Sequence, residues 1–165
     1  MIRQEIWEEM KKAKTYNLSC LHYVNKKRKF NRNYNIFIIG VAAIGGPTFF
    51  LSHWFAFVTT IAASLLEIFR GFMPAFCQSE EELVKLDSLA TYYGDTLQKL
   101  EDLWNCHENP DNPDEKALMK EKAKILKKSS ENEVLMNKLL RSLSQKEDDE
   151  IRKQADDYLI RKFYE

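Results

Sequence analysis

Two apolar stretches constrain the fold of this chain more than any other feature. They are residues 34–51 (YNIFIIGVAAIGGPTFFL) and 54–69 (WFAFVTTIAASLLEIF). Each is about as long as a helix must be to cross a hydrocarbon core of ~30 Å, because an α-helix rises ~1.5 Å per residue. Only Glu67 carries a formal charge in either stretch, and Ser52 and His53 alone separate them. We therefore expect a transmembrane helical hairpin over residues 34–76, with Trp54 at an interface.

The alternative is a buried hairpin in the core of a soluble α-helical protein. Two helices that are apolar all round would need several amphipathic elements to wrap them. The apolar faces of the remaining helices are expected to pack against one another, so the sequence favours the membrane.

Charge is distributed unevenly, although the formal net charge is zero. Residues 1–33 hold nine Lys or Arg and three acidic residues, which gives this segment a net charge of +6. Residues 78–165 hold fifteen Lys or Arg and twenty-one acidic residues, which gives a net charge of −6. Cations before an apolar span mark the cytoplasmic side. We expect both termini in the cytoplasm and Ser52 on the far side.

A run of cations lies directly before the first apolar stretch. Cations in this position suit anionic lipid head groups, and we expect this run to anchor the chain at the membrane surface. No aromatic platform or reading motif for nucleic acid follows it. The residues of the run are Lys26, Lys27, Arg28, Lys29 and Arg32.

Small and polar residues recur on one face of the second stretch: Ala56, Thr60 and Ser64, followed by Glu67. This face either packs against the first stretch or lines a water-filled path in an oligomer. Glu67 and Arg70 are spaced to form an interfacial ion pair, and the alternative is a ring of carboxylates at a pore mouth.

In the first stretch Ala42 and Gly46 form a small-xxx-small pair that suits close packing of helices.

Amphipathic helices are expected on both sides of the apolar stretches. Apolar and polar residues do not alternate with a period of two anywhere in the chain, so no strand is expected. Residues 2–33 carry an apolar stripe of Ile6, Met10, Ala13, Cys20 and Val24, which Trp7, Leu18 and Leu21 widen. Residues 79–108 begin with the capping box Ser79–Glu82. They carry a heptad-like seam of Leu86, Ala90, Tyr93, Leu97, Leu100 and Trp104. A bend is expected near Ser129 and Ser130. The last helix is expected over residues 148–164, with apolar residues at helical spacing: Ile151, Ala155, Tyr158, Leu159 and Phe163. The predicted class is all-α, with a cytoplasmic bundle built from an N-terminal helix (1–33) and a C-terminal region (79–165).

Sequence motifs for catalysis, phosphate binding and metal binding are missing. GxGxxG, GxxxxGK[ST], HExxH and GxSxG do not occur, and the three histidines lie in different segments. Cys106 and His107 are adjacent, which does not supply a zinc site by itself. We expect no enzyme activity, no cofactor and no metal.

The order of these parts resembles the SLATT family of bacterial two-transmembrane effectors. The resemblance rests on an amphipathic helix with Trp7, Ala13, Tyr16 and His22, the basic run to Arg32, two spans with a tight turn, and a long helix after Ser79. It covers roughly residues 6–143.

The resemblance implies a homo-oligomeric effector that damages the bacterial inner membrane in antiphage defence. It also implies a regulatory partner, such as a nucleotide-signal synthase or its cyclic oligonucleotide product. A membrane-anchored scaffold that recruits a cytoplasmic partner, or a small ion-channel subunit, are the alternatives. Toxicity on overexpression would distinguish an effector from a scaffold.

Overall fold

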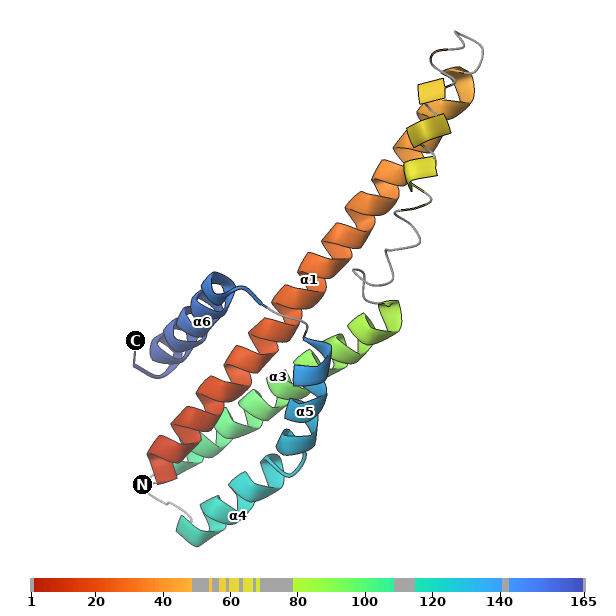
Figure 1. The fold of residues 1–165 in the computed structure, drawn as a ribbon. Helices are drawn as coiled ribbons and strands as arrows, with labels where there is room; N and C mark the ends of the chain where they lie inside the picture. Colours follow the sequence, from red (N-terminus) through yellow and green to blue (C-terminus); the bar gives the residue numbers. More distant parts are fainter. Residues whose placement is uncertain are drawn as a thin grey trace. The chain divides into compact units, whose positions relative to one another are not determined.

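The computed structural model describes residues 2–48, 54, 57–58, 60–62, 64–66, 68, 79–108, 115–140 and 143–164. Over these residues the protein is all-α and contains no strand, which confirms the predicted class. The helices, drawn in Figure 1, are α1 (Ile2–Thr48), α3 (Glu80–Glu108), α4 (Glu115–Ile125), α5 (Ser129–Leu139) and α6 (Gln145–Tyr164).

The chain divides into two compact units. Unit 1 consists of Met1–Val24 and Val84–Glu165, and unit 2 consists of Asn25–Leu83. Unit 1 is a helical bundle. Unit 2 contains the basic run and the described parts of both apolar stretches.

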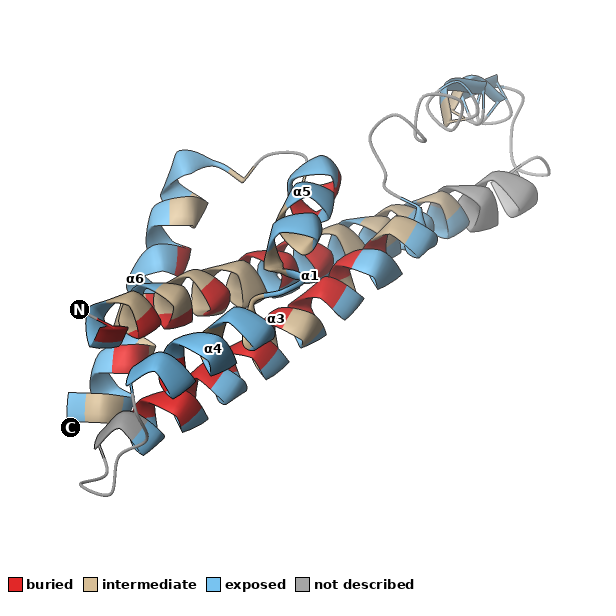
Figure 2. Ribbon diagram, turned by 90° about the horizontal axis from the view of Figure 1, so that it is seen from below, coloured by how far each residue is buried: buried red, intermediate tan, exposed pale blue. Residues whose placement is uncertain are grey.

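The core of unit 1 is a seam between α1 and α3. Apolar residues recur at steps of three and four along both helices, so that one stripe of each faces the other, as Figure 2 shows in red. The α1 stripe contains Ile2, Ile6, Met10, Ala13, Cys20 and Val24. The α3 stripe contains Leu86, Ala90, Tyr93, Leu97, Leu100 and Trp104. All six seam residues predicted on residues 79–108 are therefore buried.

The buried side chains form two clusters, one toward each end of the seam. In the first, the start of α1 meets the end of α3, together with Leu118 of α4 and Leu159 of α6. In the second, Cys20 and Val24 meet the start of α3, together with Met136 and Leu139 of α5. Because the start of α1 contacts the end of α3, the two helices run antiparallel.

The predicted stripe on the first helix is wrong in one detail. We expected Leu21 to widen it, but Leu21 is exposed, and Ser19 and Tyr23 are buried instead. Near Leu21 the buried stripe therefore extends on the side of Ser19 and Tyr23, whereas Trp7, also predicted to widen the stripe, packs against the buried core. The helix also continues beyond its predicted end at residue 33 and runs unbroken to Thr48.

Helix boundaries follow local capping chemistry. The backbone N–H of Glu82 donates to Ser79 Oγ at 3.2 Å, which confirms Ser79 as the N-cap of α3. A turn over residues 126–128 separates α4 from α5, close to the bend predicted at Ser129. Helix α6 begins at Gln145, three residues before the predicted Asp148.

No helix within the described parts of the chain combines the length and the apolar character that a membrane crossing requires. The transmembrane hairpin over residues 34–76 stays a prediction.

Candidate functional site

Unit 2 presents large apolar side chains to its surroundings. Of the side chains that the structure describes between residues 34 and 68, none is buried. The most exposed apolar ones are Ile36, Phe37 and Ile39 on α1, and Trp54, Phe57, Val58 and Ile68 in the second stretch. A soluble monomer rarely exposes so many large apolar side chains in one region, so this surface is the first candidate for a functional contact.

The predicted head-group residues lie on α1 directly before this apolar surface. Lys26, Lys29 and Arg32 are exposed, and Lys27 and Arg28 are half-buried. Arg28 Nε lies 3.4 Å from Glu80 Oε1, so this cation also ties α1 to the start of α3 within unit 2. The helix thus passes directly from exposed cations to exposed apolar side chains, the order expected at a lipid interface.

The predicted pore-lining face is described only in part. Thr60 and Ser64 are helical and exposed. Ala56, Glu67 and Arg70 lie outside the described residues, so their proposed roles stay predictions. The backbone of Ala42 and Gly46 belongs to α1, but their side-chain positions are outside the described part of the structure.

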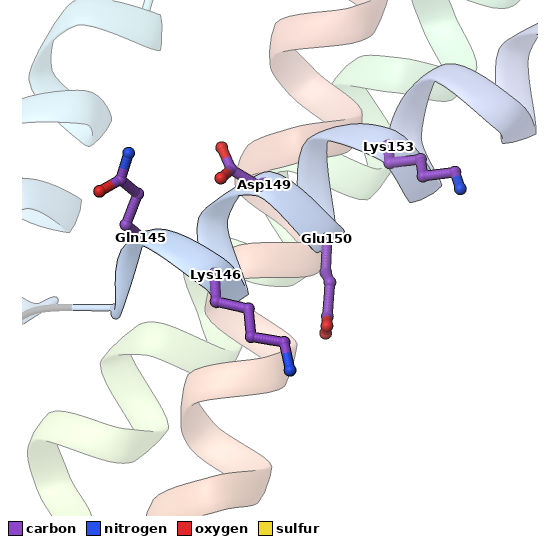
Figure 3. Close-up of a pocket in the computed structure, with 5 residues that line it drawn as sticks. All are labelled: Gln145, Lys146, Asp149, Glu150 and Lys153. Atoms are coloured by element: carbon purple, nitrogen blue, oxygen red, sulfur yellow. The ribbon is translucent and has the colours of Figure 1, made fainter.

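Figure 3 shows a surface depression on α6 that does not resemble an active site. Its five lining residues, Gln145, Lys146, Asp149, Glu150 and Lys153, all come from this one helix and spread along it. Within the described part of the chain α6 alone lines this depression, and the face of a single helix does not enclose a substrate. Among the described residues no group of three His, Cys, Asp or Glu side chains is placed to hold a metal ion.

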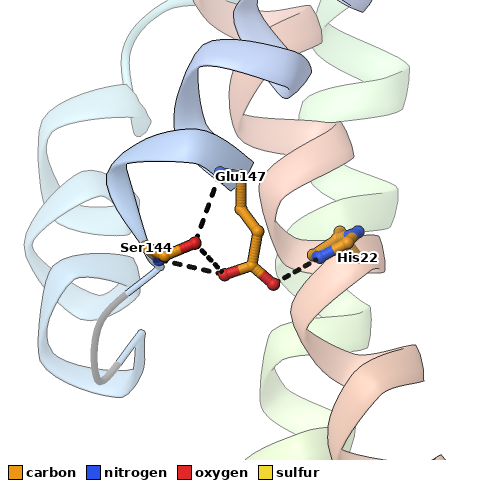
Figure 4. Close-up of polar contacts among 3 residues, drawn as sticks. All are labelled: His22, Ser144 and Glu147. Carbon is orange, nitrogen blue, oxygen red and sulfur yellow. Dashed lines mark hydrogen bonds and ion pairs between the residues drawn. The ribbon is translucent and has the colours of Figure 1, made fainter.

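Polar ties between distant helices are the most specific chemistry in unit 1, and sequence analysis missed them. The first centres on Glu147, shown in Figure 4, whose Oε1 lies 3.2 Å from His22 Nε2 of α1. Its Oε2 accepts from the Ser144 backbone N–H at 3.0 Å and from Ser144 Oγ at 2.8 Å, while the Glu147 N–H donates to Ser144 Oγ at 3.4 Å. This reciprocal capping box starts α6. The spacing Ser-x-x-Glu was a visible signal for it.

The second tie joins α1 to α5 through Glu133. Lys12 Nζ donates to its Oε2 and Tyr16 Oη to its Oε1, both at 2.8 Å. The hydrogen bond from Lys12, followed by that from Tyr16, holds the pKa of Glu133 below its usual value. The hydrogen bond to Glu133 raises the pKa of Lys12 in return. A carboxylate paired in this way stabilises the docking of α5.

The third tie joins α3 to α6 through Glu101, which is only 6% exposed. Lys162 Nζ donates to Glu101 Oε2 at 2.6 Å, and Tyr158 Oη donates to Oε1 at 3.0 Å. Lys14 Nζ lies 3.8 Å from the centroid of the Tyr158 ring, and burial lowers the pKa of Lys14. These partners satisfy the buried carboxylate, so the cluster is a structural tie between helices.

The chain matches no protein-family model, no curated protein and no solved structure.

Proposed function

We propose that this chain is an effector that inserts into the bacterial inner membrane, oligomerises there and permeabilises it, arresting growth in antiphage defence. One observation supports the membrane contact above all: large apolar side chains are exposed throughout the described part of residues 34–68. Transferring them from water into lipid is favourable by about 25 cal/mol for each Å² of apolar area removed from water.

In this proposal residues 34–76 of unit 2 form the transmembrane hairpin, and unit 1 remains in the cytoplasm with both termini. The basic run from Lys26 to Arg32 contacts anionic head groups, because each cation near such a surface contributes about 1 kcal/mol. The resemblance to the SLATT family supports the same layout and the role in defence.

The path through the membrane would form between several copies, since one hairpin cannot enclose it. Thr60, Ser64 and Glu67 would line this path, with Ala56 continuing their face and Arg70 at its mouth. Ala42 and Gly46 would allow close packing between hairpins. The activity is not enzymatic and uses no cofactor. A nucleotide-signal synthase, or the cyclic oligonucleotide it makes, would be the regulatory partner.

A membrane-anchored scaffold is the second candidate. Unit 1 carries exposed apolar side chains of its own, Met119, Val134 and Leu135, which could receive a cytoplasmic partner.

Two measurements on the full chain test these functions. The purified protein is expected to float with vesicles that contain phosphatidylglycerol, and recovery in the lipid-free fraction would contradict the membrane contact. Overexpression in bacteria is expected to depolarise the inner membrane, as reported by a potential-sensitive dye, and to arrest growth. Flotation without depolarisation would instead identify the scaffold.

A further inference from the structure

Helix α5 is attached to unit 1 by few buried side chains. Of its 11 residues only Met136 and Leu139 are buried, and both belong to the second core cluster, with Cys20 of α1 and Tyr93 of α3. Lys128, its N-cap residue, makes no side-chain capping hydrogen bond. A helix of this length has little stability of its own, so α5 depends on its docking to the bundle.

The tie through Glu133 is the most specific attachment of α5. Its carboxylate accepts hydrogen bonds from Lys12 and Tyr16, both at 2.8 Å. Lys12, Tyr16 and Cys20 follow one another at steps of four residues, so they lie along one side of α1. Helix α5 therefore docks on the side of α1 that carries Cys20.

The preceding helix, α4, is attached at a different place. Its buried residue Leu118 belongs to the first core cluster, and Lys122 pairs with Glu5 near the start of α1. A turn over residues 126–128 separates α4 from α5. The attachments of α5 can therefore break while those of α4 are kept.

The core beneath α5 contains buried hydroxyl groups that are not satisfied. Tyr93 is 1% exposed, and its Oη, like that of Tyr92, has no hydrogen-bond partner among the described residues. The ring centroid of Tyr93 lies 5.1 Å from that of Tyr16, whose Oη donates to Glu133 of α5. A buried hydroxyl without a partner is costly, and water would satisfy it once α5 moved away. The core that α5 closes therefore opposes the docking of α5.

We propose that α5 is a releasable helix, which undocks from α1 and α3 while the rest of unit 1 stays folded and thereby uncovers the second core cluster around Cys20 and Tyr93. Docking gains the Glu133 tie and the burial of Met136 and Leu139, whereas undocking gains water for the tyrosine hydroxyls. The two states are separated by less free energy than folded and unfolded unit 1. A ligand that binds only the undocked state would populate it, so α5 makes unit 1 switchable.

This inference does not rest on the proposed function. The residues that hold α5 all belong to unit 1, whereas the candidate membrane surface belongs to unit 2. Helix α5 can therefore undock whether or not the chain enters a membrane.

The thiol of Cys20 reports the opening. It is fully buried, and burial raises its pKa to about 12, so it is unreactive while α5 is docked. In the full chain with Cys77→Ser and Cys106→Ser it is the only thiol. Its labelling by N-ethylmaleimide, followed by mass spectrometry, is expected to depend little on urea below the unfolding transition, because undocking one short helix exposes little surface. A labelling rate that rises with urea as steeply as global unfolding does would overturn the proposal.

Two substitutions with opposite expected effects assign this opening to α5. Glu133→Gln removes the charge from the tie and is expected to speed labelling about fivefold. Tyr93→Phe removes an unpaired hydroxyl from the docked state and is expected to slow labelling at least about fivefold. Glu121→Gln, the same change at an exposed position of α4, is the control and is expected to label as the parent does. Unchanged labelling rates in both Glu133→Gln and Tyr93→Phe would equally overturn the proposal.

Discussion

Glu147 and His22 join α6 to α1 across 125 residues of sequence. Glu147 Oε1 lies 3.2 Å from His22 Nε2, while Oε2 of the same carboxylate closes the capping box with Ser144 (Figure 4). One carboxylate therefore determines both where α6 begins and where its first turn sits on α1.

Replacing Glu147 with alanine is expected to lower the free energy of unfolding by about 1–2 kcal/mol, because the cap and the tie are lost together. His22→Ala should cost less, about 0–1 kcal/mol, since it removes only a partly exposed pair. Glu150, one turn later, is an exposed carboxylate. Glu150→Ala is therefore the control, and its free energy of unfolding should stay within about 0.5 kcal/mol of wild type. Urea unfolding followed by circular dichroism measures all three. Equal losses for His22→Ala and Glu147→Ala would show that the capping box contributes nothing.

The tie through Glu133 predicts a dependence of stability on pH. Its folded-state pKa is lowered by Lys12 and Tyr16, so its contribution is fully present above the unfolded value of 4.5 and is lost as pH falls through the folded-state pKa. Glu133→Gln should therefore lower the free energy of unfolding by up to about 1 kcal/mol at pH 7. It should also reduce the decline of that free energy as pH falls below 4.5. Glu121→Gln, in an exposed pair with Lys124, should leave that decline unchanged. Urea midpoints from pH 3 to pH 7 provide the measurement, and parallel declines for Glu133→Gln and wild type would contradict the assignment.

Local patterns in the sequence predicted most of unit 1. Steps of three and four on residues 79–108 placed Leu86 and Trp104 on one face, and both are buried. The apolar positions Ile151 and Leu159 likewise predicted the buried face of α6. The start of α6 was missed because only the apolar pattern was followed there, although Ser144 and Glu147 have the same spacing as Ser79 and Glu82.

The polar ties could not be predicted, because they depend on which helices become neighbours. Glu133 and Glu101 look like ordinary surface carboxylates in sequence. Only the packing of α5 against α1 brings Lys12 to Glu133, and only the packing of α6 on α3 brings Lys162 to Glu101. The exposure of Leu21 has the same origin, since the position of a stripe within a bundle is set by the partner helices.

The predicted topology can be tested with single cysteines. In a background with Cys77→Ser and Cys106→Ser, Ser52→Cys should react with a membrane-impermeant thiol reagent added outside spheroplasts. Ser130→Cys, at an exposed position of unit 1, should react only after lysis. We expect this orientation because the cations from Lys26 to Arg32 lie directly before the first apolar stretch, and such cations mark the cytoplasmic side. Labelling of Ser130→Cys by reagent added outside intact spheroplasts would show that the orientation is the reverse of the predicted one.

Membrane contact by unit 2 is the central claim, and two matched positions test it. Ile39 on α1 is 67% exposed and Val134 on α5 is 68% exposed, so neither Ile39→Asp nor Val134→Asp removes a buried contact. A carboxylate within a membrane span costs about 3 kcal/mol, whereas one on a surface in water costs little. The measurement is partitioning of each variant into vesicles that contain phosphatidylglycerol, by flotation. Ile39→Asp should bind at least about tenfold more weakly than wild type while Val134→Asp binds equally well. Equal binding of both variants and wild type would contradict the account.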